Sequence, residues 1–270
     1  VRRIQAFAAG VGDFNPCYFD DTRPGGLVGH PGLVFAFQWN NRPQPARPLS
    51  TRAASRYVNS GADVRYARPF RQDEVITCQG EIVAVKQIRP GVFTAQRYTM
   101  RDATAATVAE LDYAGILRGG VTEGPDRESA PLPPLPQPSP DNTEPVWEAE
   151  LQIGPEAPHV YTACADIYNP IHTERTVALA AGLPDVILHG SATLTIAARE
   201  VIDRCLDGDP TSLARLAGQF RAMVFPGHPI TVRCHEDRTG ADGGREIFFD
   251  VLNHQGEYAV ASGLVVSRPA

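Results

Sequence analysis

Hydrophobic positions change their spacing along the first half of the chain, from a helical to an alternating pattern. Residues 2–12 place their apolar side chains on one face of a helix, and the apolar run 33–39 predicts a second helix. Residues 41–60 are polar and rich in proline at their start, which predicts a loop with one short helix. Alternating apolar and polar residues then predict strands at 64–66, 74–87, 92–100 and 107–117.

The second half repeats this order, preceded by one additional strand at 146–153. Helices are expected at 173–181 and 191–205. The strands that follow are expected at 213–225, 230–234, 246–252 and 258–266. The same order of helices and strands in both halves indicates a duplication. The first half has no counterpart of the opening strand, so either it begins upstream of the residues given or it has lost that strand.

Residues 124–145 separate the two halves and contain eight prolines. Proline lacks a backbone donor, so this density excludes a helix or an inner strand and predicts an extended, semi-rigid linker. The predicted organisation is therefore an N-terminal domain at 1–120, a linker at 121–145 and a C-terminal domain at 146–270.

A short motif follows the first expected helix in the first half and precedes the helix expected at 173–181 in the second half. In the second half, Asp166, Asn169 and His172 offer a carboxylate, an amide and an imidazole within seven positions around an Asn-Pro pair. In the first half, Asp13 stands two residues before the Asn-Pro pair, and Tyr18 takes the place of the histidine. Asn-Pro restricts the backbone before the proline and is typical of a loop.

A histidine precedes the apolar helix of each half, at His30 and His189. In the second half His189 is followed directly by Gly190, at the expected start of the helix. A backbone N–H at a helix start has no partner within the helix, so it can bind an anion or a developing oxyanion. An acid, a base and an oxyanion donor are thus available within thirty residues.

Asn-Pro-Ile-His172, Ile-Leu-His189-Gly190 and the apolar helix that follows resemble the MaoC-like (R)-specific enoyl-CoA hydratases and dehydratases. The resemblance covers nearly the whole chain outside the linker. It implies an α+β tandem (double) hotdog fold, with an antiparallel sheet wrapping a central helix in each half. It further implies a hydratase or dehydratase of fatty acid or polyketide metabolism, acting on a 2-enoyl or 3-hydroxyacyl thioester.

The resemblance also implies roles for individual residues. His172 is expected to be the general base, a carboxylate to orient the water and return a proton, and Gly190 to bind the thioester oxygen. No cofactor is expected, since coenzyme A or an acyl carrier is part of the substrate. The expected assembly is a homodimer or a pair with another hotdog subunit.

One position departs from the family pattern, in which the acid lies two residues before the Asn. Here that position is Ile167, and Asp166 is one residue away from it. A bulge could bring Asp166 to the water. Alternatively each half keeps one member of the pair, Asp13 with Tyr18 and Ile167 with His172, which predicts an impaired hydratase. A third interpretation is a related elimination that uses His172 alone or Asp13 with Tyr18.

Other functions and purely structural roles compete with these assignments. A thioester-binding subunit that needs a partner is the first alternative, and a hotdog thioesterase ranks last because the second-half helix has no carboxylate before Glu200. Asn169 could cap the short helix after it, and Tyr18 could be a packing residue. His30 and His189 are expected to bond the backbone.

Composition narrows the function classes further. A net charge of −6 argues against broad nucleic-acid binding, and no apolar run approaches the length of a membrane span. Five cysteines without C-x-x-C spacing predict reduced thiols in a cytoplasmic protein. Neither a metal-ligand spacing nor a nucleotide-binding motif occurs, so no metal and no nucleotide cofactor are expected.

Overall fold

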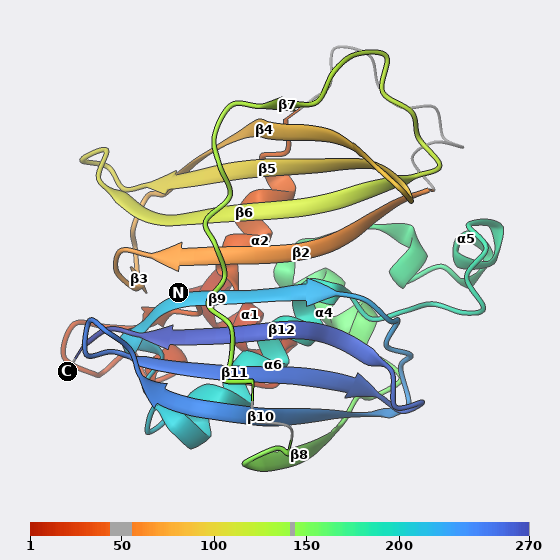
Figure 1. Cartoon of the computed structure of the whole chain (residues 1–270). Helices are drawn as coiled ribbons and strands as arrows, with labels where there is room; N and C mark the ends of the chain where they lie inside the picture. Colours follow the sequence, from red (N-terminus) through yellow and green to blue (C-terminus); the bar gives the residue numbers. More distant parts are fainter. Residues whose placement is uncertain (44–55, 141–143, 270) are drawn as a thin grey trace.

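The computed structural model describes residues 1–43, 56–140 and 144–269. One antiparallel sheet contains ten strands in the order β7-β4-β5-β6-β2-β9-β12-β11-β10-β8 (Figure 1). Its strands are β2 (Tyr57–Tyr66), β4 (Thr77–Ile88), β5 (Gly91–Arg101), β6 (Thr107–Arg118), β7 (Arg127–Glu128), β8 (Trp147–Gln152), β9 (Leu213–Phe220), β10 (Pro229–Thr239), β11 (Arg245–Asn253) and β12 (Tyr258–Ser267). The short strands β1 (Val28–Gly29) and β3 (Phe70–Arg71) form a separate pair.

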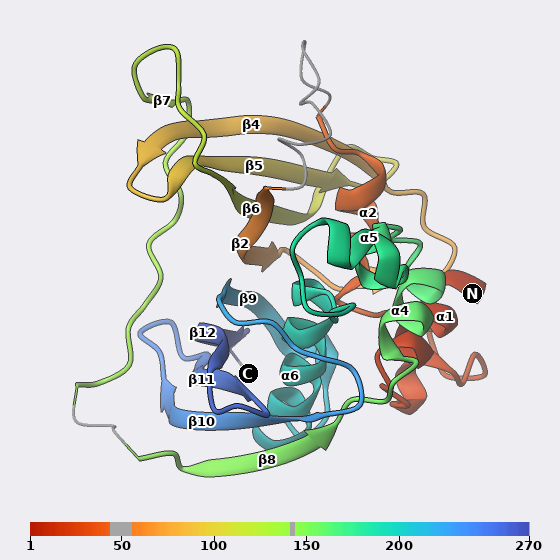
Figure 2. The ribbon, with the colours of Figure 1, turned by 90° about the vertical axis from the view of Figure 1, so that its right-hand side faces the viewer.

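The helices lie on one side of this sheet, as Figure 2 shows. They are α1 (Arg2–Gly10), α2 (Leu33–Asn40), α4 (Ala157–Ala165), α5 (Arg175–Ala180) and α6 (Gly190–Cys205), with the 3-10 turns η1 (Pro16–Tyr18), η2 (Pro170–His172) and η3 (Pro210–Ser212). Most of α6 is buried, as expected of a helix at the centre of its half. It packs so closely that a Cβ at Gly218 of β9 would lie 2.9 Å from the side chain of Leu194.

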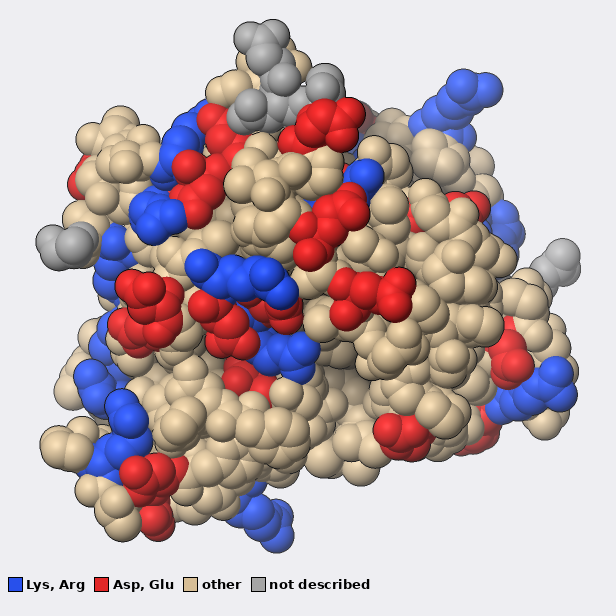
Figure 3. Space-filling view, turned by 90° about the horizontal axis from the view of Figure 1, so that it is seen from below, with Lys and Arg blue, Asp and Glu red and all other residues tan. Residues whose placement is uncertain are grey.

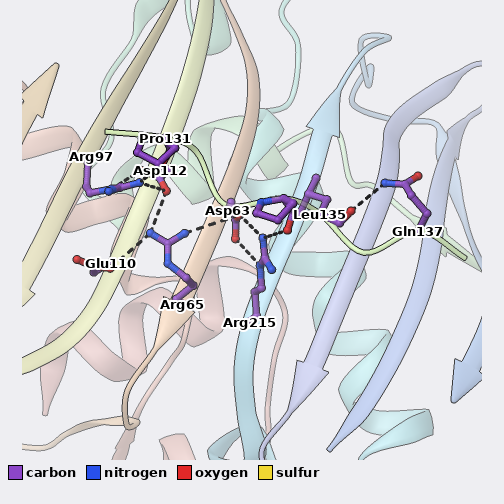
Figure 4. Close-up of polar contacts among 10 residues, drawn as sticks. Asp63, Arg65, Arg97, Glu110, Asp112, Pro131, Leu135, Gln137 and Arg215 are labelled. Carbon is purple, nitrogen blue, oxygen red and sulfur yellow. Dashed lines mark hydrogen bonds and ion pairs between the residues drawn. The ribbon is translucent and has the colours of Figure 1, made fainter. Parts of the chain in front are cut away.

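The two half-sheets join edge to edge at β2 and β9. Gly61 pairs with Gln219 and Arg65 with Arg215, so ladder hydrogen bonds run continuously from one half to the other. The sheets expected of two separate halves are therefore parts of one sheet. An ion pair crosses the same junction on the outer face, where Arg215 of β9 binds Asp63 of β2, and beside it Arg65 of β2 binds Asp112 of β6 (Figure 4).

The proline-rich linker crosses the outer face of the sheet (Figure 2). Strand arginines donate to its carbonyl oxygens: Arg97 to Pro131 at 3.1 Å and Arg215 to Pro134 at 3.1 Å (Figure 4). Proline carbonyls remain free to accept because no ladder uses them. Leu135 adds apolar contact with Ala217, Phe248 and Leu264. The linker is thus extended, as expected, and is fastened to both halves.

Three sequence-based boundaries differ from the structure by five residues or more. The strand expected at 230–234 is β10, which continues to Thr239 because its pairing with β11 extends to Arg245. Strand β2 begins at Tyr57, inside the predicted loop, because it pairs with Leu117 of β6; the short helix expected there falls on residues 44–55, outside the described part of the chain. Strand β9 ends at Phe220 rather than at 225, since the segment after it turns away and the Val224 carbonyl accepts from the Leu188 N–H at 2.8 Å. Contacts with segments distant in the sequence therefore set the start of β2 and the end of β9.

The opening strand of the second half, β8, pairs with residues 229–234 of β10. In the described part of the first half nothing corresponds to it, and the linker strand β7 pairs with β4 only at Ala84 and Val85. The asymmetry expected from the sequence is therefore visible at the two ends of the sheet.

Candidate active site

Helix α4 and the turn η2 carry the second-half motif. The helix ends at Ala165, and Asp166 adopts the left-handed conformation, with φ of 57°. This turn directs Ile167 into the core, where it is 5% exposed, and leaves Asp166 exposed. The nearest polar group recorded for the Asp166 carboxylate is the Asn40 amide, at 3.5 Å.

The first half has the same backbone arrangement 154 residues earlier. There Gly12 takes the left-handed conformation, with φ of 67°, and Asp13 is the residue that points inward, 7% exposed. The two motifs have the same spacing between this position and their Asn-Pro pair, so no bulge carries Asp166 toward His172. Asp166 corresponds to Gly12, and the counterpart of Asp13 is Ile167.

His172 lies at the end of η2 and is 8% exposed. Its Nδ1 is 2.8 Å from the carbonyl oxygen of Ile187. A carbonyl can only accept, so Nδ1 carries the proton and Nε2 of the neutral ring keeps its lone pair. Burial lowers the pKa of His172 from 6.5 to about 4, against a smaller opposing effect of the Ile187 carbonyl. The ring is therefore a neutral base at physiological pH.

His189, directly before α6, stacks on His172 with ring centroids 3.6 Å apart. It is 4% exposed, and its pKa lies well below the ordinary value because of burial first and the His172 charge second. Its Nε2 is 3.5 Å from the Thr162 hydroxyl, whereas Nδ1 is buried without a hydrogen-bond partner. The expectation that its polar atoms bond the backbone is met in part, because the backbone of Ile167 forms a hydrogen bond with the ring that opposes the lowering of its pKa, while Nδ1 has no partner among the described residues.

Gly190 begins α6 beside this stack. In the described part of the chain no acceptor is recorded for its N–H, as the first position of a helix requires. A Cβ at Gly190 would lie 3.1 Å from the ring of Phe220, so a glycine fits here without moving that ring. Asn169 makes no capping hydrogen bond, so its expected capping role is not realised.

The first-half motif is arranged differently. The His30 ring donates from Nε2 to Asp13 at 3.2 Å, while its Nδ1 accepts from the Gly32 N–H at 3.0 Å. Asp13 also accepts from the backbone of Asn15 at 3.1 Å. Tyr18 is 1% exposed and packs on the His30 ring, and burial raises the pKa of its hydroxyl. Carboxylate and imidazole are thus engaged with each other, and Tyr18 is placed as a packing residue.

The two motifs are separated by a row of rings across the contact of α1 with α4. The row runs from His30 through Phe7 and Tyr161 to His189, with centroid distances of 5.0, 5.8 and 4.9 Å. Asp13 lies beyond the first end of this row and His172 beyond the last. The structure therefore does not bring these two residues together.

Sequence reasoning did not identify the Ile187 carbonyl, the stacking role of His189 or the partnership of His30 with Asp13. The matched histidines before the two central helices were the available signal. A backbone acceptor such as Ile187 leaves no trace in residue identity.

No group of three or more possible metal ligands occurs among the described residues, and no described helix is long and apolar enough to span a membrane. An outer-face groove of about 160 Å³, lined in part by Pro136, His235 and Tyr258, lies away from His172. On the face seen from below, acidic and basic side chains are interspersed (Figure 3).

Comparison with known proteins agrees with this architecture. Residues 138–255 match the MaoC like domain, and residues 1–111 match the FAS1-like dehydratase domain region. A 137-residue segment is 31% identical to the enoyl-CoA hydratase ChsH3 of Mycobacterium tuberculosis, covering 49% of this chain and 46% of that protein. The chain spans about half, or less, of the length of the curated relatives it matches.

Solved structures share the whole fold. The MaoC-like dehydratase of Phytophthora capsici superposes with a TM-score of 0.83 at 20% identity, over 100% of this chain and 93% of that one. A Mycobacterium tuberculosis protein with a double hotdog fold superposes with a TM-score of 0.61 at 16% identity, over 98% and 90%. The fold is a double hotdog, which confirms the predicted fold class. The chain therefore carries a MaoC-like domain in its second half and a FAS1-like dehydratase region in its first half.

Proposed function

We propose that this protein is an acyl-thioester hydratase or dehydratase that adds water reversibly to a 2-enoyl thioester at the second-half site. The observation that carries the proposal is a neutral, oriented His172 stacked on His189, which directly precedes Gly190 at the start of α6; the Gly190 N–H has no recorded acceptor in the described part of the chain. The match of residues 138–255 to the MaoC like domain supports the reaction class, and relatives named enoyl-CoA hydratase support the substrate class.

In the proposed reaction, the thioester carbonyl accepts from the Gly190 N–H. As water adds to Cβ, charge develops on this oxygen, and a donor aimed at it in advance lowers the barrier. His172 Nε2 takes the proton of the attacking water, and the Nδ1–H bond to Ile187 holds the resulting imidazolium in place.

The enolate is then protonated at Cα. With Ile167 at the position of the family acid, His172 is the group available to return this proton, so one residue serves as base and then as acid. Water supplies both the hydroxyl at Cβ and, through His172, the hydrogen at Cα. The coenzyme A or acyl-carrier portion is part of the substrate, and no separate cofactor takes part.

The test is hydration of crotonyl-CoA and of a longer 2-enoyl-CoA, followed by loss of the enoyl absorbance. We expect His172→Ala to lower kcat/KM by about 10²–10⁴-fold. Asp13→Asn, in a variant shown to remain folded, and Asp166→Asn should each leave it within about threefold, since neither carboxylate contacts His172. A large loss of kcat/KM in either aspartate variant would mean that the aspartate takes part in the reaction, and that His172 is not the only proton-transfer group.

A second candidate is a catalytically impaired thioester-binding subunit that needs a partner hotdog. Ile167 favours it, because an apolar side chain cannot transfer a proton. This subunit would bind a non-hydrolysable acyl-CoA analogue while the isolated protein turns over no 2-enoyl-CoA of any chain length. A hotdog thioesterase is less well supported, because Glu200, the first carboxylate of α6, is bound to Arg204.

A further inference from the structure

The contact between His189 and His172 corresponds to the contact between His30 and Tyr18 in the first half, but it is closer and more nearly parallel. In the first half, His30 binds the carboxylate of Asp13 and packs on Tyr18 with centroids 4.8 Å apart and planes tilted by 42°. In the second half, Ile167 replaces the carboxylate, and the imidazoles lie nearly parallel at 3.6 Å and 24°. The loss of the ionic partner is accompanied by a closer ring contact.

We propose that His189 is a positioning residue for His172, whose ring is held by the His189 face and the Ile187 carbonyl. The proposal rests on the proposed function, because His172 is the base that needs positioning. This role is separate from the position of His189 at the start of α6, which does not by itself require a ring contact with His172.

Two constraints are needed to fix an imidazole. The hydrogen bond from Nδ1 to the Ile187 carbonyl fixes the position of one ring nitrogen of His172, but the plane of the ring can still rotate about that bond. A flat neighbour in van der Waals contact with the face removes this freedom. On its other side, His189 is itself held by the ring of Tyr161, whose hydroxyl donates to Ser191 on α6. The direction of Nε2 is thereby set by packing.

The charges around the stack fit this role. From α4 the facing titratable groups are Tyr161, whose pKa burial raises, and Asp166, which is exposed. Glu174, next to α5, binds the Tyr168 hydroxyl, and Asp185 faces Arg175.

On the helix that follows His189, the first charged residue is Arg199, which donates to the carbonyl of Gly12. No carboxylate of the described residues forms an ion pair with either imidazole of the stack. A flat neutral ring, rather than a counter-charge, therefore holds the base.

His189→Phe and His189→Leu distinguish positioning by a flat ring from simple filling of space. Both side chains fill the site, but only phenylalanine offers a flat face. We expect His189→Phe to keep kcat within about threefold, and His189→Leu to lower it by about tenfold with KM changed less than twofold. His254→Phe is the matched control, since His254 stacks on His228 at 4.0 Å at the exposed surface.

A second readout does not depend on turnover. The ¹⁵N shifts of the His172 ring report which nitrogen carries the proton. Wild type and His189→Phe should show the Nδ1–H form, whereas His189→Leu should show a mixture of both forms. If wild type hydrates no thioester while the ¹⁵N shifts change as expected, the proposed function fails and the positioning role stands.

Other outcomes overturn the proposal. Wild-type kcat and ¹⁵N shifts in folded His189→Leu would mean that His189 is a packing residue only. Equal damage in the phenylalanine and leucine variants would assign the effect to the imidazole nitrogens rather than to the flat face. If His189→Leu does not fold, the phenylalanine variant decides: loss of its Nδ1–H form overturns the proposal, and retention of that form with wild-type kcat supports it.

Discussion

The two motif regions have nearly the same backbone and opposite chemistry. Each has a helix, a left-handed residue, an inward-pointing position and an Asn-Pro turn, followed by a histidine before a buried helix. In the first half the inward residue is Asp13, and it binds His30. In the second half it is Ile167, and the turn ends in His172 instead of Tyr18.

The comparison shows how two side-chain differences, at the inward position and at the end of the turn, change the hydrogen-bond partners in two sites with the same backbone. A buried carboxylate beside an imidazole forms a closed pair, each satisfying the other. With an isoleucine in its place, neither imidazole of the second half has a carboxylate partner, and His172 keeps a lone pair available to a substrate. Family motifs therefore have to be interpreted at the level of hydrogen-bond partners as well as residue identity.

The largest expected effect concerns the two residues at the same motif position. Tyr18→Phe should leave hydration of crotonyl-CoA within about twofold, while His172→Gln, which keeps a polar side chain, should lower it by about 10²-fold or more. Initial rates at saturating and low substrate measure both. A greater loss from Tyr18→Phe would place the chemistry in the first half.

Asp13→Asn should destabilise the protein by about 1–3 kcal/mol, because the carboxylate accepts from both His30 and the Asn15 N–H, and an amide with one acceptor oxygen leaves one of these donors unsatisfied. Asp166→Asn, at an exposed position, should change stability by less than about 0.5 kcal/mol. Urea unfolding at neutral pH measures both. Equal stability of the two variants would show that the first-half pair adds nothing to folding.

The free energy of unfolding should decrease as the pH is lowered through the range in which His172 is protonated in the unfolded chain but still neutral in the folded one. The pKa of His172 is lowered from 6.5 to about 4, so its contribution is complete above 6.5 and is lost as the pH falls toward 4. Between about pH 7 and 4.5 the loss from this group is about 2–3 kcal/mol.

A variant without this imidazole tests the assignment of that loss. His172→Phe should show a correspondingly smaller decrease in unfolding free energy between the two pH values, while Tyr18→Phe should keep the wild-type decrease. Denaturant titrations at both pH values provide the comparison. An unchanged decrease in His172→Phe would assign the pH dependence to other groups.

The smallest expected effect tests whether Asp166 only ends a helix. A left-handed backbone favours glycine, which stands at the equivalent position 12, so Asp166→Gly should stabilise the protein by roughly 0.5–1 kcal/mol and leave hydration unchanged. Thermal unfolding and the hydration assay measure the two parts. Loss of hydration would instead assign chemistry to the Asp166 carboxylate.

Local signals in the sequence anticipated much of the fold. The Asn-Pro pairs lead into short turns, the run after Gly190 forms the buried helix, and alternating residues form the strands. The start of β2 could not be anticipated, since Tyr57 is extended only because Leu117 lies beside it. The same holds for the union of the two sheets, which depends on strands about 150 residues apart.

By itself, the sequence determined the duplication, the resemblance to MaoC-like dehydratases that implied a double hotdog, and the candidate residues of the site, because periodicity, turn chemistry and motif spacing are local properties. Only the tertiary structure decided which of those residues meet. It turned Asp166 outward, paired Asp13 with His30, and gave His172 a carbonyl and a ring as partners. Hydrogen bonds and stacking between distant segments depend on how the chain folds back on itself, and residue order alone does not specify them.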